Sequence, residues 1–345
     1  MNEFTALNTK VRGMTRHLLK EEDWENANSS HSLNDIYQFL LNNSGYHDVI
    51  NSLKSDHITT QTLTQALHTA VFYDFHKLFL FASLEQREIL KLYGLRFEYN
   101  FIRRSLKTTE AKEVLPILYP PFADYLDDHR GFSTAETVSA ESIRKVIATF
   151  SHTAFAPYFE QFDHLFGEEH YEHYAFEETF EQYTWSLAFK KARQILSKRE
   201  LATFHELVGS EIDFSNISII YRLKFYYEAD ENYISEQLLS GGRRLKKEDL
   251  DTLIQTSDRQ RFQNQLAIFG YPSLVDDMSY RLASERQQQE TLSQMEAKLV
   301  RLMPNSLLTA LHYLNKKNEE SERLIHIVEQ VGFSSLAQIG KEYSR

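Results

Sequence analysis

The sequence predicts an all-α protein, and three observations support that class. Glycine and proline are scarce, with 11 and 6 among 345 residues, and no proline precedes Pro116. Long helices tolerate neither residue in their interior. Apolar residues recur at helical spacing along most of the chain, and the alternating pattern of a β-strand is hard to find in it. Because 42 % of the residues are hydrophobic, the helices are expected to enclose a sizeable core.

Capping residues indicate where individual helices begin. The segment SLNDIYQFLL places its apolar residues on one face of a helix, and Ser32 and Asp35 form a capping pair at its start. The segment DFSNISIIYR is expected to open another helix, with Asp213 as its N-terminal cap. Both segments therefore predict a helix with a defined first turn.

Glycine and proline indicate where helices end. Residues 232–239 are expected to form a helix that stops at Gly241 and Gly242, because glycine adopts a positive φ without strain. The long polar stretch 287–303 is expected to be a helix that ends at Pro304. The cluster PILYPP, residues 116–121, predicts a tight corner or a linker between two units.

A short pattern occurs three times along the chain. Each copy has an apolar helical run, a small residue, an aromatic residue and another apolar residue three positions later. The aromatic residues are 109 and then 116 positions apart, which predicts a threefold repeat with domains at 1–112, 113–228 and 229–345. The small and aromatic residues are Gly45 and Tyr46, Ala154 and Phe155, and Gly270 and Tyr271.

An asparagine motif recurs in step with this pattern. Asn216 precedes an apolar turn that ends in Arg222, and Asn100 precedes a similar turn. A third copy would fall near Glu322, where the asparagine is replaced. Each asparagine either bridges backbone groups where helices cross or contacts a partner. Repetition favours the structural joint, because an active site is usually needed once.

Residues 146–189 contain no Lys or Arg and are rich in acidic residues and histidine. Glu169 and His173 are four residues apart, as metal ligands on one helix face would be. Because no H-E-x-x-H motif accompanies them, an acidic surface that meets a basic partner is favoured over a divalent metal site. The residues concerned are His152, Glu160, Asp163, His164, Glu168, Glu169, His170, Glu172, His173, Glu177, Glu178 and Glu181.

Two basic clusters stand out elsewhere. Arg12, Arg16 and Lys20 lie four residues apart and form a stripe on the predicted first helix, where a solvated face is the simplest interpretation. The second cluster follows Gly242 without the spacing of a phosphate-binding loop, so nucleotide binding is disfavoured. It predicts an exposed turn, with partner docking or contact with anionic lipid left open. Its residues are Arg243, Arg244, Lys246 and Lys247.

Several function classes lack their sequence signals. The net charge of −11 argues against general nucleic-acid binding. No apolar run is long enough to span a bilayer, and the start MNEFTALNTKVRG lacks the apolar core of a signal peptide. Cys is absent, and no G-x-S-x-G elbow accompanies Ser, His and Asp. No catalytic residue, cofactor-binding residue, cofactor or metal ligand is therefore predicted.

Five stretches spread over nearly the whole chain match the motifs of one family. They are NTKVRGMTRHLL with EEDW at 8–24, the helix at 33–46, DFSNISIIYR at 213–222, ISEQLLSGGRRL at 234–245 and KNEESERLI at 317–325. In these stretches the chain resembles the C-type subunit of bacterial and archaeal V/A-type (vacuolar-type) rotary ATPases, whose eukaryotic counterpart is the d-type subunit. Arg16, His17, Ser44, Gly45 and Glu322 depart from the family pattern, which suggests a divergent bacterial member.

The resemblance implies a fold and a role. The fold would be three pseudo-symmetric helical domains arranged as a funnel. The role would be that of a non-catalytic central-rotor subunit that couples the central shaft, made of D- and F-type subunits, to the membrane rotor ring. The protein would then be cytoplasmic and peripheral on the inner face of the cell membrane, held there by protein partners alone. A helical-repeat adaptor unrelated to rotary ATPases and a metal-dependent hydrolase are the alternatives.

Overall fold

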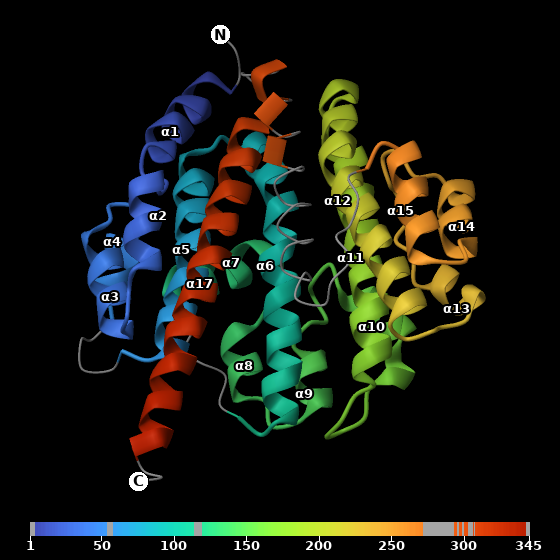
Figure 1. The fold of residues 1–345 in the computed structure, drawn as a ribbon. Helices are drawn as coiled ribbons and strands as arrows, with labels where there is room; N and C mark the ends of the chain where they lie inside the picture. The colour runs from blue at the N-terminus through green and yellow to red at the C-terminus, as the bar shows by residue number, and fades with distance from the viewer. Residues whose placement is uncertain are drawn as a thin grey trace. The chain divides into compact units, whose positions relative to one another are not determined.

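The computed structural model confirms the all-α prediction (Figure 1). It describes residues 4–53, 58–113, 119–271, 293–294, 297–298, 300–302, 306 and 308–342. Within these ranges the chain forms helices and no β-strand, and extended pairing is limited to an isolated antiparallel bridge between Phe166 and Tyr171. The arrangement of three domains as a funnel stays a prediction.

The chain folds as two compact units. The first joins Met1–Leu90 to Leu302–Arg345, so the two ends of the sequence fold together. The second is Lys91–Arg301. The domain boundaries proposed after residues 112 and 228 stay predictions.

Two long helices form the axis of the first unit. Helices α5 and α17 lie side by side and run antiparallel (Figure 1). Ser321 on α17 donates a hydrogen bond to the carbonyl of Leu67 at 2.8 Å, and Tyr313 donates one to the Asp74 carboxylate at 2.6 Å. The helices described in this unit are α1 (Thr5–Thr15), α2 (Glu21–Asn28), α3 (Leu33–Asn42), α4 (His47–Ile50), α5 (Thr60–Phe81) and α17 (Leu308–Glu342).

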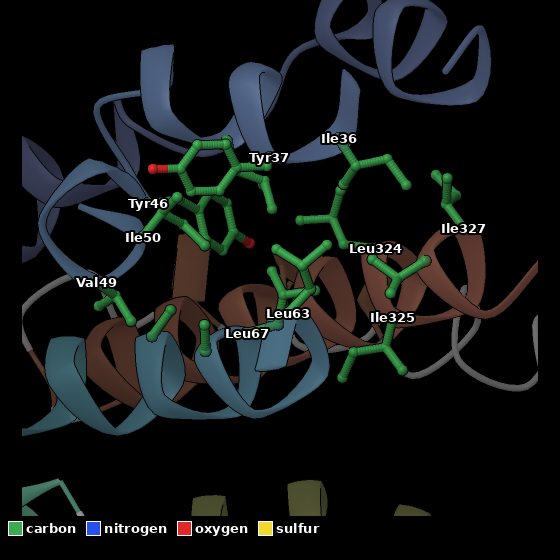
Figure 2. Packing of buried hydrophobic residues seen from close by; sticks show 14 of the residues in the cluster. Ile36, Tyr37, Tyr46, Val49, Ile50, Leu63, Leu67, Leu324, Ile325 and Ile327 are labelled. Carbon is green, nitrogen blue, oxygen red and sulfur yellow. The ribbon is translucent and has the colours of Figure 1, made fainter. Parts of the chain in front are cut away.

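Helix α3 begins where the sequence predicts it. The Ser32 hydroxyl accepts from the backbone N–H of Asp35 at 3.1 Å, and the Asp35 carboxylate accepts from that of Ser32 at 2.9 Å. The apolar face of α3 packs on α5 and α17, as Figure 2 shows for Ile36, Leu67 and Leu324. Full burial of each such side chain stabilises the fold by roughly 1.5–3 kcal/mol.

The second unit contains a series of shorter helices, the two long helices α11 and α12, and most of the long helix α6. Helix α6 (Leu84–Glu110) begins in the first unit and continues into the second. The other helices described are α7 (Pro120–Arg130), α8 (Thr134–Ser139), α9 (Ile143–Ala148), α10 (Ala156–Gln161), the 3₁₀-helix η2 (Asp163–Leu165), α11 (His173–Ile195), α12 (Lys198–Phe225), α13 (Glu231–Glu236), α14 (Lys247–Gln255) and α15 (Arg259–Ile268).

The predicted breakers act as expected in part. Pro120 and Pro121 begin α7, where a missing backbone N–H is tolerated, and the rest of the predicted corner, 116–118, lies outside the described residues. Helix α7 and the end of α6 both belong to the second compact unit, and a repeat boundary between them stays a prediction. Gly241 has the expected positive φ of 103°, although the helix before it already ends at Glu236. The stretch 287–303 lies largely outside the described residues.

Candidate functional site

Asp213 lies in the middle of α12, which corrects the prediction that it caps a helix. Its buried carboxylate accepts hydrogen bonds from the backbone N–H of Arg244 at 2.8 Å and of Leu245 at 3.4 Å, and from the Tyr271 hydroxyl at 2.5 Å. Burial raises the pKa of this carboxyl, and the hydrogen bonds only partly offset that effect. Asp213 therefore ties the loop before α14 and the residue after α15 to α12.

The paired glycines let that loop approach α12 closely. A Cβ atom on Gly242 would overlap the Asp213 carboxylate, and a Cβ on Gly209 of α12 would lie only 3.1 Å from the carbonyl oxygen of Gly241. The approach therefore requires glycine at 242, and at 209 a larger residue would fit only if the loop moved by a few tenths of an ångström. The sequence GG thus belongs to a helix-to-loop joint and not only to a helix end.

Asn216 lies one helical turn after Asp213 and is completely buried. Its amide donates to the carbonyl of Leu239 at 2.9 Å, and its side-chain oxygen accepts from the backbone N–H of the same residue at 2.7 Å. The side chain thus satisfies two backbone groups that follow α13. The structural interpretation of Asn216 is confirmed, because a buried side chain with both ends bonded is closed to a partner.

Asn100 does not repeat this joint, so the predicted second copy is wrong. Its side chain is exposed on α6. The buried polar residue of that turn is Glu98, whose carboxylate accepts from the Arg130 guanidinium at 2.6 Å. Burial raises the pKa of Glu98, and the charge of Arg130 opposes that rise. Helix α6 is therefore joined to α7 by an ion pair.

The third expected position, Glu322, is also exposed. The buried carboxylate of this part of α17 is instead Glu320. It accepts from the Tyr46 hydroxyl at 2.8 Å, from the Lys317 ammonium at 3.0 Å and from the backbone N–H of Leu19 at 2.6 Å. Glu320 therefore links α17 to the segments that precede α2 and α4.

Lys317 is buried beside Glu320, one turn earlier on the same helix. Its ammonium lies 3.3 Å from the centre of the Tyr46 ring and 3.3 Å from the carbonyl oxygen of Gly45. Burial lowers the pKa of Lys317, against the raising effect of Glu320. A Cβ on Gly45 would collide with the backbone of His17, so this small residue is needed for the approach.

The sequence did not reveal that four of the described long helices each bury a carboxylate, one of them being Asp74 on α5. The other three lie within three positions of the expected asparagine sites. We call these residues, Glu98 on α6, Asp213 on α12 and Glu320 on α17, the joint carboxylates. Two of them pair with the repeated aromatic residue, namely Tyr46 and Tyr271. An acidic residue inside an apolar helical turn, such as Asp213 between Ile212 and Phe214, was the available signal. Periodicity alone does not distinguish it from an exposed acid one position away.

The acidic stretch is divided between exposed residues and ion pairs. Arg144 pairs with Asp163, Lys112 lies 3.7 Å from Glu169, and Arg103 contacts Glu177 at 2.7 Å. Burial raises the pKa of Glu181, which is half-buried on α11. The exposed members are Glu160, Asp163, Glu168, Glu169 and Glu172. Exposed carboxylates are therefore present before α11, mostly outside helices, and their contact with a basic partner stays a prediction.

Glu169 and His173 do not share a helix face, which corrects the spacing argument for a metal site. Helix α11 starts at His173, and Glu169 lies in the bridged turn before it. His173 and His170 both contact the carboxylate of Glu110 at the end of α6. Burial alone would raise the pKa of Glu110, but the hydrogen bonds from these two histidines lower it.

No metal centre is visible in the part of the chain that the structure describes. No group of three or more Asp, Glu and His side chains there could hold a metal ion. That no metal, cofactor or catalytic residue belongs to this chain stays a prediction.

The basic clusters are less continuous than predicted. Helix α1 ends at Thr15, so Arg12 and Arg16 do not share one helix with Lys20, although all three side chains are exposed. In the second cluster Arg243 contacts Glu206 at 2.5 Å, and Arg244 donates to the carbonyl of Gly270 at 3.2 Å. Lys246 and Lys247 are exposed where α14 begins. Two of the four basic residues in the predicted exposed turn, Arg243 and Arg244, therefore make contacts within the protein.

None of the helices described is both long enough and apolar enough to cross a membrane. In the described parts of the chain, buried side-chain hydrogen bonds and ion pairs hold helices to their neighbours, and charged groups lie on the surface.

Comparison with known proteins identifies the family. A family model described as "ATP synthase (C/AC39) subunit" matches residues 7–335. No individual curated protein matches the chain. The family match spans nearly the whole sequence and agrees with the resemblance carried by the five motifs. The chain therefore belongs to the C/AC39 subunit family of V/A-type ATP synthases.

Proposed function

We propose that this chain is a non-catalytic rotor subunit that couples the central shaft of a V/A-type ATPase to its membrane rotor ring. The observation that carries the proposal is the family match over residues 7–335. The match favours this role over that of an adaptor unrelated to rotary ATPases. The subunit would transmit torque and leave ATP chemistry and ion transport to its partners.

The packing supports a force-transmitting role. A coupling element must resist deformation, and its resistance depends on contacts that have no alternative arrangement. The joint carboxylates and Asn216 fasten long helices to other elements with buried hydrogen bonds. Buried polar groups of this kind favour one arrangement, because any shift leaves a donor or acceptor without a partner.

The charged surface supports protein partners. Exposed carboxylates before α11, among them Glu160, Glu168 and Glu172, suit a basic docking surface such as one on the D- or F-type shaft subunits. Attachment to the membrane would then come through the rotor ring, with the chain on the cytoplasmic side.

Reconstitution of the ATPase with and without this chain tests the proposal. With the chain, ATP hydrolysis by the soluble head should drive ion transport into vesicles that hold the membrane ring. Without it, hydrolysis should continue and transport should stop, because torque no longer reaches the ring. Full transport without the chain, or a purified chain that binds neither shaft nor ring, would reject the proposal.

A further inference from the structure

The corner between α5 and α6 exposes three large apolar side chains. Leu80, Phe81 and Leu84 keep 59 %, 52 % and 79 % of their surface in solvent. A single exposed apolar residue is ordinary on a soluble protein, but three large ones within five positions of one helix corner suit an interaction site. We call these three residues the apolar corner.

The backbone beneath the apolar corner is fixed by side-chain hydrogen bonds. The backbone N–H of Ser83 donates to the side chain of Gln86 at 3.1 Å, and the N–H of Gln86 donates to the Ser83 hydroxyl at 3.3 Å. Arg87 donates to the carbonyls of Phe79 at 2.9 Å and Leu80 at 3.1 Å, and its guanidinium lies 5.4 Å from the centre of the Phe79 ring. These bonds occupy carbonyls at the end of α5 that lack intrahelical partners. The apolar corner is therefore preorganised, which reduces the entropy lost when a partner binds.

Acidic side chains border the apolar corner. Glu85 follows Leu84 directly, and Glu88 lies four residues after Leu84 on the same face of α6. Both carboxylates are exposed. The partner surface should therefore carry positive charge around an apolar centre.

This charge pattern distinguishes among the partners that could cover the apolar corner. A second copy whose twofold axis passes through the apolar corner would place Glu85 and Glu88 close to the same residues of its partner. An anionic bilayer would also bring negative charge onto them. A protein socket with an apolar floor and a rim of Lys or Arg covers the apolar side chains and places positive charge beside Glu85.

We propose that the apolar corner docks into an apolar, basic-rimmed socket on a protein of the rotary complex. The proposal takes the identity of that complex from the proposed function and adds the surface that makes the contact. Leu84 and Phe81 would fill the socket, while Glu85 would pair with its rim.

The double substitution Phe81→Ser with Leu84→Ser tests the contact. The matched control is Phe333→Ser on α17, which also removes an exposed phenyl ring, 75 % in solvent, from the first unit. Binding of the full chain to purified membrane ring in detergent, and separately to purified shaft subunits, is measured for each variant. The double variant should lose at least about 30-fold in affinity for one of the two partners, as expected for buried anchor residues. The control should bind like wild type.

A charge reversal tests the contact with a variant that keeps the apolar side chains, so that lost binding is not confused with misfolding. Glu85→Lys leaves the apolar corner intact and should weaken binding to the same partner, with a smaller dependence of affinity on salt than wild type shows. Thermal unfolding of all variants should match wild type, since the altered side chains are exposed.

Several outcomes would overturn the proposal. If wild type binds ring or shaft and the double variant binds equally well, the apolar corner is not the contact and the proposed function is unaffected. If wild type binds neither, the proposed function fails together with the assigned class of partner. A loss of equal size in the Phe333→Ser control would show a non-specific apolar effect. Self-association, or sedimentation with phosphatidylcholine–phosphatidylglycerol vesicles, that requires Phe81 and Leu84 would assign the apolar corner to a second copy or to lipid.

Discussion

Glu320 in the first unit and Asp213 in the second are both buried in a long helix, but the charges of these two carboxylates are satisfied differently. In the first unit Glu320 accepts from the Lys317 ammonium, a tyrosine hydroxyl and one backbone N–H. In the second, Asp213 accepts from two backbone N–H groups and the Tyr271 hydroxyl. None of the hydrogen bonds described for Asp213 comes from a cationic side chain.

This difference shows which groups hold each long helix to its neighbours. Lys317 and Glu320 lie on the same helix, so their ion pair does not by itself hold two elements together. Glu320 bridges to other segments through the Tyr46 hydroxyl and the Leu19 N–H, and Lys317 does so through the Gly45 carbonyl. The lysine keeps the buried charge compensated, at the expense of burying a second charge. In the second unit the Asp213 carboxylate likewise bridges α12 to a loop, but its described partners are backbone N–H groups and a tyrosine hydroxyl, with no ammonium among them.

Removal of Lys317 should have the largest effect on either joint. We expect Lys317→Ala to lower the free energy of unfolding by about 3–5 kcal/mol, because Glu320 would stay buried without its cation. Urea-induced unfolding at neutral pH measures the loss.

The double substitution Lys317→Met with Glu320→Gln serves as the control for this prediction. It removes both charges and should recover most of the lost stability, because a buried ion pair is often replaceable by neutral groups. A double variant as unstable as Lys317→Ala would show that the packing of the lysine, and not charge compensation, stabilises the first unit.

Asn216→Ala should have the next largest effect. Two buried backbone groups of Leu239 would lose their partners, so we expect a loss of about 2–4 kcal/mol in the free energy of unfolding. Affinity for the shaft or ring should be unchanged in the folded variant. Asn100→Ala, at the exposed position on α6, should change stability by less than about 0.5 kcal/mol. Loss of partner binding in a fully stable Asn216→Ala protein would show that Asn216 contributes to partner binding.

Local chemistry made part of the fold predictable from the sequence. Helix α3 starts where Ser32 and Asp35 predict it, because its cap involves residues three positions apart. The start of α12 was missed although Ser197 and Glu200 form the same kind of capping pair. Asp213 competes with Ser197 as a cap in the sequence, and only the tertiary contacts of Asp213 show that the helix runs through it.

The joint carboxylates could not be predicted, because their partners are distant in the sequence. Tyr46 meets Glu320 across almost the entire chain, and Asp213 meets Tyr271 from 58 positions away. The repeat identified both tyrosines but assigned the polar position of the motif to Asn100, which is exposed, and not to Glu98. Helical periodicity fixes a face only to within about one residue. A shift of two positions along α6 therefore separates a buried ion pair from a solvated side chain.

The two tyrosines offer a finer comparison of the joints. Tyr271→Phe should lower the free energy of unfolding by about 2 kcal/mol, because Asp213 would keep only backbone donors. Tyr46→Phe should cost about 1 kcal/mol, because Glu320 keeps the ammonium and the Leu19 N–H, and an aromatic ring still lies under Lys317. Chemical denaturation of both variants decides the order. Equal losses would mean that the cation does not substitute for the hydroxyl.

The smallest expected effect is a change in the pH dependence of stability when Asp213 is replaced. Burial raises the pKa of Asp213 above its unfolded value of 3.8, so the folded state binds this proton more tightly than the unfolded state. The contribution of Asp213 to stability is therefore complete below that value and is lost as pH rises through the folded pKa. The free energy of unfolding of wild type should increase relative to that of Asp213→Asn as pH falls from about 7 to about 4. Urea unfolding across this range measures the difference between the two proteins, and the same substitution at exposed Asp124 is the control. A difference that is constant with pH would show that the backbone N–H groups and Tyr271 compensate the buried charge as fully as a cation would.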